Sequence, residues 1–388
     1  MRFSKAATTI DEQVALIQER GMQVDDIEAA KKWLEGVGYY RMSAYWLPFE
    51  EPPAEDQTRS KKFRPGTNFT KIHDLYVFDR RLRVVLLEAI ERIEIHVRSR
   101  WTYRMSHAYG SHAHLDHNLF AGATNHAEQL VRLARAVEKS EETFIQHYRT
   151  KYTEPFSPPL WASTELMTMG ELSKWVQATK DNSIKSAVAR DIGLPTRETL
   201  EGTLQVFAYV RNICAHHGRL WNRRLVKRLP YIRRYRNDLV IAAVQGQQQP
   251  DNRIYNVIVV LLQLLHSQAT DSTYFARLRD LVDDIEDQDR TSMGFPDDWR
   301  DQALKTRERS ALRSIYPRPQ RLGLFHLCQM QPQHCGLASA RHRRLLSQLD
   351  KNLTPIRPRR SRLRQFPPPR WQFAGMPRQR SRMSLVRI

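Results

Sequence analysis

The amino-acid sequence predicts an all-α protein, and three observations support that fold class. Long segments without Gly or Pro carry apolar residues at steps of three, four and seven, which is the repeat of one helix face. Residues that start and stop helices stand at the ends of these segments. No stretch alternates apolar and polar residues as a half-buried strand does. The hydrophobic fraction of 41% is enough for at least one core.

The N-terminal part, residues 1–66, is predicted to be a small helical module that ends in a linker. Thr9 and Glu12 have the spacing of a capping box, which marks the start of a first helix. A second helix is expected over 26–35. The aromatic-rich segment 38–49 then reads as a connection interrupted by a proline. The polar segment that follows contains Pro and Gly and is predicted to be a loop.

The second part, residues 67–304, is predicted to be a helical domain built on an unusually long helix. No Gly or Pro occurs from Thr70 to Tyr109, and the apolar residues keep to one stripe. This segment is either one very long helix or two helices in series. Further helices are expected over about 125–150, 160–180, 182–192, 195–217, 253–268 and 272–287.

The net charge of +20 lies almost wholly in the third part, residues 305–388. This tail holds 20 of the 62 Lys and Arg, two acidic residues and nine Pro, so it is predicted to be disordered. The preceding residues carry 42 basic and 40 acidic groups, so the overall pI does not indicate that the folded part binds RNA. The tail is either a basic arm that adds phosphate affinity or a non-native extension.

Cysteine usage and hydropathy predict a cytoplasmic protein without membrane contact. The sparse, odd count of three Cys argues against a disulfide framework. No N-terminal apolar run resembles a secretory signal. The longest apolar run, near 257–265, is too short to cross a bilayer. The absence of Gly-rich phosphate loops makes a nucleotide cofactor unexpected.

One short segment, RNICAHH from Arg211 to His217, gathers residues that suit RNA cleavage. On a helix, Asn212 and His216 are one turn apart on the same face, and Arg211 is long enough to join them. An imidazole, with a pKa of about 6.5, can take a proton from a ribose 2′-OH or give one to the leaving 5′ oxygen. A guanidinium can grip the scissile phosphate through two hydrogen bonds. This route needs no metal ion.

By spacing alone the motif is weak evidence. An Arg followed five residues later by a His occurs often by chance in a chain with 62 Lys and Arg and 14 His. The simpler alternative is a helix end at which a charged His favours the helix dipole and Gly218 forms the cap.

Four separated blocks of the sequence carry a family resemblance. They are GYYRMSAYW (38–46), FRPGTNFTKIHDLYVFDRRLRVVLLEAIERIEIHVRSR (63–100), YVRNICAHHGRLWNR (209–223) and MGFPDDW (293–299). In this order they resemble the bacterial abortive-infection (Abi) family, which belongs to the HEPN superfamily. The resemblance spans about residues 8–304 and leaves the tail outside, which favours a non-native origin of the tail.

The resemblance implies a HEPN-like helical bundle with a metal-independent RNase site, usually assembled across a dimer. Carried over to this chain, Arg211 and His216 would be catalytic, with Asn212 as their polar companion. The expected function is toxin-like RNA cleavage by 2′-OH attack in phage defence. The expected partners are RNA, a second copy of the chain, and an antitoxin or a phage trigger.

Two alternatives belong to other functional classes. One is a non-catalytic HEPN-type module that binds RNA or senses a phage component. The other is a structural or regulatory protein in which the segment only shapes a dimer interface.

Four more residues are candidate RNA contacts. His217 and Arg219 follow the motif directly. Arg100 and Arg104 lie on the long helix, whose basic face is a candidate groove wall beside the motif. Arg100 and His107 also fit the loose motif spacing, although a chance match is the favoured explanation.

Other side chains have simpler explanations than a functional one. The aromatic residues of 39–46 can stack on bases, but packing of the N-terminal module is favoured. The histidines of 111–124 are expected to be solvated. Cys214 and its neighbouring histidines lack the paired spacing of a zinc site, and the Cys and His of the tail stand in Pro- and Arg-rich sequence. No metal site or cofactor is therefore expected.

Overall fold

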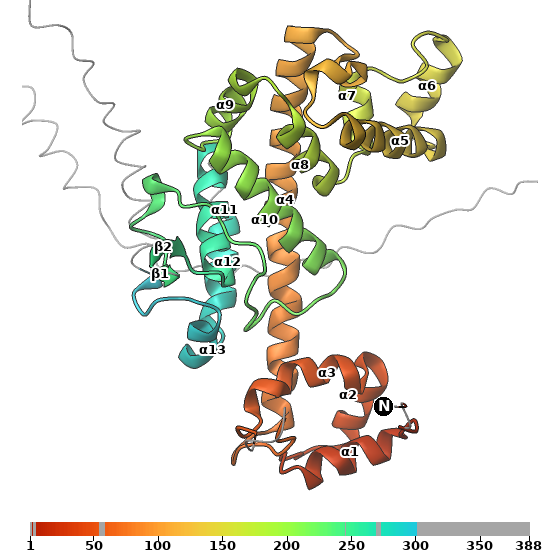
Figure 1. The fold of residues 1–388 in the computed structure, drawn as a ribbon. Coiled ribbons are helices and arrows are strands. Elements are labelled where there is room, and N and C mark those ends of the chain that lie inside the picture. The colour runs from red at the N-terminus through yellow and green to blue at the C-terminus, as the bar shows by residue number, and fades with distance from the viewer. Residues whose placement is uncertain (1, 3–4, 54–58, 245, 269–272, 301–388) are drawn as a thin grey trace, which may run out of the picture. The chain divides into compact units, whose positions relative to one another are not determined.

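The computed structural model describes residues 2, 5–53, 59–244, 246–268 and 273–300, and these form an all-α protein as predicted (Figure 1). They belong to one compact unit, Met1–Pro317. The predicted disordered tail over 305–388 lies outside the described residues.

The elements of the described part are nearly all helical. The α-helices are α1 (Ile10–Glu19), α2 (Ile27–Val37), α3 (Tyr39–Trp46), α4 (Phe69–Tyr109), α5 (Ala123–Lys139), α6 (Thr143–Lys151), α7 (Leu160–Ser163), α8 (Met169–Ala178), α9 (Asn182–Asp191), α10 (Arg197–Ala215), α11 (Ile254–Gln268), α12 (Thr273–Asp283) and α13 (Asp287–Ser292). Short 3-10 helices occur at Leu47–Phe49, Ala113–Leu115, His117–Leu119, Thr164–Leu166 and Arg233–Tyr235. Two strands, β1 (Ile241–Val244) and β2 (Gln247–Pro250), pair antiparallel with Ile241 opposite Pro250.

Helix α4 is the element on which the other helices pack (Figure 1). It is one continuous helix of 41 residues, which decides between the two predicted arrangements. Asn68 caps its first turn by accepting from the amide of Thr70, and Gly110 ends it at φ +87°. Helices α3, α8, α9, α10, α11 and α12 all contact α4.

The N-terminal module contains one more helix than predicted. The capping box of Thr9 and Glu12 is present at the start of α1. The aromatic segment expected to be a connection forms α3 instead, separated from α2 by Gly38 at φ +90°. Tyr45 and Trp46 are buried, so packing explains half of this aromatic cluster.

The segment between α4 and α9 is more broken than its periodicity indicated. The helix predicted over 125–150 is two helices, α5 and α6. The break follows from Ser140, whose side chain accepts from the amide of Glu142 in a non-helical turn. The expectation that the loop histidines are solvated is wrong for His114. Its side chain is fully buried and shares a hydrogen bond with Ser157 at 3.1 Å.

The hairpin of β1 and β2 was not predicted. Its strands are four residues long, so no alternation of polar and apolar residues has room to develop. Asn256 at the start of α11 supports the base of the hairpin. Its side-chain amide donates to the carbonyl of Val240 and accepts from the backbone amide of the same residue.

Candidate functional site

The segment RNICAHH forms the C-terminal end of α10, which places its polar side chains on the surface. Helix α10 begins at the N-cap Thr196 and buries one face against α4 and α8. At its end, Ile213 and Cys214 belong to the buried face. Asn212 and His216 are exposed one turn apart, and Arg211 is half-buried beside them.

The helix end is a Schellman motif in which a histidine occupies the left-handed position. The amide of Gly218 donates to the carbonyl of Ile213 at 2.7 Å, and the amide of His217 donates to that of Cys214 at 3.1 Å. His217 has φ +58°, a conformation that usually belongs to glycine. Gly218, the expected cap, is therefore the residue after the left-handed one.

Gly218 is required by close packing rather than by its φ angle. A Cβ atom at this position would lie 3.0 Å from Cγ2 of Ile213 and 3.3 Å from its carbonyl oxygen. The chain can turn back on α10 at this point because no side chain is present.

Two arginines tie this turn to the N-terminal module. Arg41 of α3 donates to the carbonyl of His217 at 2.8 Å. Arg219 donates in the opposite direction, to the carbonyl of Ala44 in α3. The predicted RNA contact Arg219 is thus half-buried and structural.

A buried carboxylate anchors the chain behind the turn. Asp79 of α4 is fully buried and accepts from the backbone amides of Leu220 at 3.0 Å and Trp221 at 2.7 Å. The hydroxyl of Tyr45 and the guanidinium of Arg83 donate to the same carboxylate. This network joins α3, α4 and the segment after α10 around one charge.

Burial dominates the electrostatics of this network. It raises the pKa of the Asp79 carboxyl, and Arg83, Tyr45 and the two amides oppose that rise. Burial, followed by the charge of Asp79, raises the pKa of the nearby Cys214 thiol to about 12. Cys214 is thus a neutral, buried side chain at neutral pH, which argues against a role as a nucleophile.

Glu94 of α4 is the charged neighbour of Arg211. Burial raises the pKa of Glu94, and the positive charges of Arg98 and Arg211 oppose the rise. Arg98 is committed to Glu94 by a hydrogen bond of 2.7 Å. The charges of Glu94 and Arg211 therefore attract each other, without an ion pair between them among the described residues.

The candidate contacts Arg100 and Arg104 have a different neighbour. Both donate to Asp191 at the end of α9, each with its Nε atom at 2.8 Å. Arg104 adds a second bond to the other carboxylate oxygen at 2.8 Å. The structure thus pairs these two arginines with each other through Asp191, whereas Arg211 faces Glu94.

The three motif side chains have few internal partners. Within the part of the chain that the structure describes, no hydrogen bond or ion pair holds the side chain of Arg211, Asn212 or His216. A half-buried guanidinium, an exposed amide and an exposed imidazole at a helix end are available to bind a phosphodiester and exchange protons with it.

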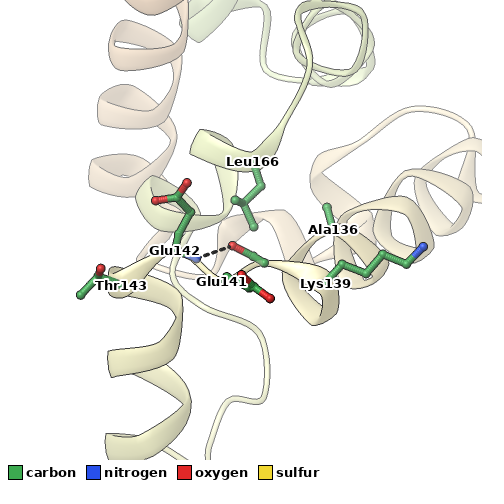
Figure 2. A pocket seen from close by; sticks show the side chains of 7 residues that line it. Ala136, Lys139, Glu141, Glu142, Thr143 and Leu166 are labelled. Atoms are coloured by element: carbon green, nitrogen blue, oxygen red, sulfur yellow. Dashed lines mark hydrogen bonds between the residues drawn. The ribbon is translucent and has the colours of Figure 1, made fainter. Parts of the chain in front are cut away.

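Two pockets of the described surface lie away from the motif. A pocket of about 410 Å³ lies between the end of α5 and the start of α6, where Lys139, Glu141 and Glu142 surround it (Figure 2). A second pocket, of about 620 Å³, is lined by residues of α4 and of the segment before α13, among them Lys71, Asp74 and Glu286. None of the predicted site residues lines either of these two pockets.

Two findings on metals and membranes apply to the described residues. In that part of the chain, no three His, Cys, Asp or Glu side chains lie together in a way that can hold a metal ion. Among the same residues, no helix combines the length and the apolar character that a bilayer crossing needs.

Sequence reasoning missed the residues that hold the motif in place. Asp79 is one of them: it stands four residues after Leu75 and three before Leu82, on the apolar stripe of α4 itself. That position was a usable signal, because a carboxylate in such a stripe must find donors. The role of Arg41 has no comparable signal, since its partner is a backbone carbonyl.

The fold and the site define an all-α protein with an Arg–Asn–His group at the surface of a helix end, behind which a buried ion pair anchors the chain. Residues 32–222 match the family model described as Abi-like protein, and the chain belongs to this family. The match contains most of the motif block but not the block at 293–299. The family indicates a role in abortive-infection phage defence. Comparisons with curated proteins and with solved structures find no match.

Proposed function

We propose that this protein is a metal-independent endoribonuclease of the HEPN type that cleaves RNA in abortive infection. The observation that carries the proposal is the surface group of half-buried Arg211 and exposed Asn212 and His216, whose side chains make no hydrogen bonds among the described residues. The chain directly after this group is nevertheless fixed, by Arg41 at His217 and by Asp79 at Trp221. Pre-organised but unpartnered polar groups are what a catalytic surface requires.

The proposed reaction is an attack of the ribose 2′ oxygen on the adjacent phosphorus. The bond between the 2′ oxygen and phosphorus forms as the bond to the 5′ oxygen breaks, leaving a 2′,3′-cyclic phosphate and a 5′-hydroxyl. His216 takes the 2′ proton or supplies the proton that the 5′ oxygen needs. Arg211 binds the non-bridging oxygens and Asn212 donates to the phosphate.

A second copy of the chain completes this proposed site. In the dimer, each site takes Arg211 from one copy and His216 from the other, and water handles the proton that His216 does not. Helix α4 also exposes apolar side chains along one face, with Val84 64%, Ile95 53% and Tyr103 52% exposed. Ile95 adjoins Glu94, the charged neighbour of Arg211. A dimer through this face brings two motifs towards each other.

The test is RNA cleavage by the full chain in the presence of a chelator. We expect cleavage without metal, 2′,3′-cyclic ends, and a loss of at least about 100-fold in rate for His216→Ala. The matched control is His117→Ala, which removes an exposed histidine that is distant in the sequence from His216. Cleavage and growth toxicity that survive His216→Ala contradict the catalytic assignment.

One observation favours the non-catalytic alternative, an RNA-binding or phage-sensing module. A catalytic histidine is normally oriented by a third group, and among the described residues neither ring nitrogen of His216 has such a partner. RNA binding by a wild type that does not cleave, retained in His216→Ala, selects this alternative. The antitoxin or phage trigger remains a prediction for either function.

A further inference from the structure

The segment that follows the motif is free of acidic residues and rich in basic ones. Between Glu201 and Asp238 the sequence contains no Asp or Glu but nine Lys and Arg. The folded part of the chain is nearly neutral as a whole, so this is a local concentration of charge. Eight of these cations lie in residues 219–236, hereafter the basic loop, which connects α10 to β1.

Apolar side chains anchor the basic loop and point its cations outward. The buried anchors recur every three or four residues and are Trp221, Leu225, Leu229, Ile232 and Tyr235. The cations between them are exposed, namely Arg224, Lys227, Arg228, Arg233, Arg234 and Arg236. Leu225 is also held by its backbone, which exchanges hydrogen bonds with Asn252 at 2.8 and 2.9 Å. The loop is thus a fixed support for a row of charges.

The basic loop leads away from the motif and returns along α10. It starts at the Schellman turn beside His216. Its Pro230 packs on Gly202 in the first half of α10, where an added Cβ would lie 3.2 Å from the proline ring. Tyr235 then donates to the carbonyl of Gly193, before α10 begins, at 3.0 Å. The row of charges therefore extends over roughly the length of α10, or about 27 Å.

These cations are unpaired, in contrast to Arg100 and Arg104. Within the described residues, no carboxylate lies within ion-pair distance of any cation of the basic loop. Arg228 and Arg234 reach only the backbone carbonyls of Pro250 and Gly193. A row of unpaired cations attracts a ligand with a matching row of negative charges.

The form of the surface selects a strand rather than a small anion. The basic loop lines neither of the two described pockets, and its exposed cations follow one another along the chain rather than gathering round one point. Tyr231 is 44% exposed within the row and can stack on a base. Cations along a line with an aromatic side chain among them are the pattern of a single-stranded nucleic-acid path.

We propose that the basic loop holds the backbone phosphates of a single-stranded RNA that runs from the scissile bond at His216 along α10. This inference rests on the proposed function for the position of the scissile bond and for RNA as the ligand. It adds a binding surface for several nucleotides and a preference for unpaired RNA.

The test measures how full-length protein binds a fluorescent 2′-O-methyl RNA oligonucleotide, which cannot undergo 2′-OH attack. Binding is followed by anisotropy against salt concentration for a triple variant, Arg224→Gln, Lys227→Gln and Arg233→Gln. The matched control also replaces two arginines and one lysine, but on the exposed face of α5. Its substitutions are Arg132→Gln, Arg135→Gln and Lys139→Gln. The tail is present in every protein, so its contribution is common to all.

We expect a plot of the logarithm of the association constant against the logarithm of the salt concentration to become shallower in the loop variant. The magnitude of its negative slope should decrease by roughly 2, at about 0.7 per lost phosphate contact. The control variant keeps the wild-type slope. Equal slopes in the two variants overturn the proposal. Ultraviolet cross-linking of the same oligonucleotide supplies a second measurement, in which a cross-link at Tyr231 supports the loop and cross-links confined to 305–388 contradict it.

The two proposals fail separately. A wild type that cleaves RNA while the loop variant binds normally refutes the RNA path and leaves the nuclease intact. If the wild type never cleaves RNA but the salt dependence of binding is weaker in the loop variant, the proposed nuclease activity is contradicted. The proposed RNA-binding surface is then still supported.

Discussion

Asp79 in the first third of α4 accepts a hydrogen bond from the backbone amide of Trp221 at 2.7 Å, although the two residues are 142 positions apart in the chain. The bond fixes the point at which the chain leaves the motif and enters the basic loop. The Asp79 carboxylate also forms an ion pair with the buried Arg83. One side chain therefore contributes both to the stability of this core and to the position of the basic loop.

We expect Asp79→Asn to destabilise the protein by about 3–5 kcal/mol, because it leaves the Arg83 cation buried without its counter-charge. The free energy of unfolding from urea denaturation measures this change. The double variant Asp79→Asn with Arg83→Met removes the orphaned charge and should recover a large part of the loss. A double variant no more stable than the single one contradicts the account.

The two residues of the helix cap should respond to substitution with opposite signs. His217→Gly removes a side chain from the left-handed region and should stabilise the fold by about 0.5–1 kcal/mol. Gly218→Ala places a Cβ against Ile213 and should destabilise it by about 1–3 kcal/mol. Thermal and urea unfolding of both variants provide the measurement. Destabilisation by His217→Gly would show that the imidazole makes an essential contact.

Burial, with smaller effects of His112 and His126, lowers the pKa of His114 from 6.5 to about 4. Between these two values the unfolded chain binds a proton that the folded protein excludes. The stabilising effect of neutral His114 is therefore complete above pH 6.5 and declines as the pH falls to about 4, by about 3 kcal/mol in all.

The check is the free energy of unfolding at several pH values in this window, for wild type and for His114→Gln. The variant starts from a lower stability because it alters a buried site. Its dependence on pH should nevertheless be shallower than that of the wild type. Parallel curves would mean that His114 titrates alike in the folded and unfolded chain.

Elements whose stabilising interactions are local in the sequence could be predicted, and interactions between distant residues could not. Helix α4 was predictable because its stripe, its Asn68 cap and Gly110 are all local signals. The burial of Asp79 was missed because its partners are backbone amides distant in the sequence. The basic loop was missed because charge was counted over whole parts of the chain, whereas a strand of RNA senses charge over a Debye length of about 10 Å.

Substitution of Arg211 by Lys keeps the positive charge and tests the geometry of phosphate binding. A guanidinium makes two parallel hydrogen bonds to a phosphate, and an ammonium group does not. We expect Arg211→Lys to lower the cleavage rate at least about 10-fold and to change the affinity for uncleavable RNA much less. Equal losses in rate and affinity would assign Arg211 to binding alone.

The proposal that a second copy completes the site leads to a complementation experiment. Arg211→Ala and His216→Ala are each expected to be inactive. In a mixed dimer of the two variants, one composite site carries both lesions and the other carries none. Because a random mixture contains about half mixed dimers, co-refolding should restore roughly a quarter of the wild-type cleavage rate. If each copy holds a complete site of its own, every site in the mixture carries one lesion and no activity returns. Differently tagged variants allow the mixed dimer to be isolated, and its rate should be about half that of the wild type.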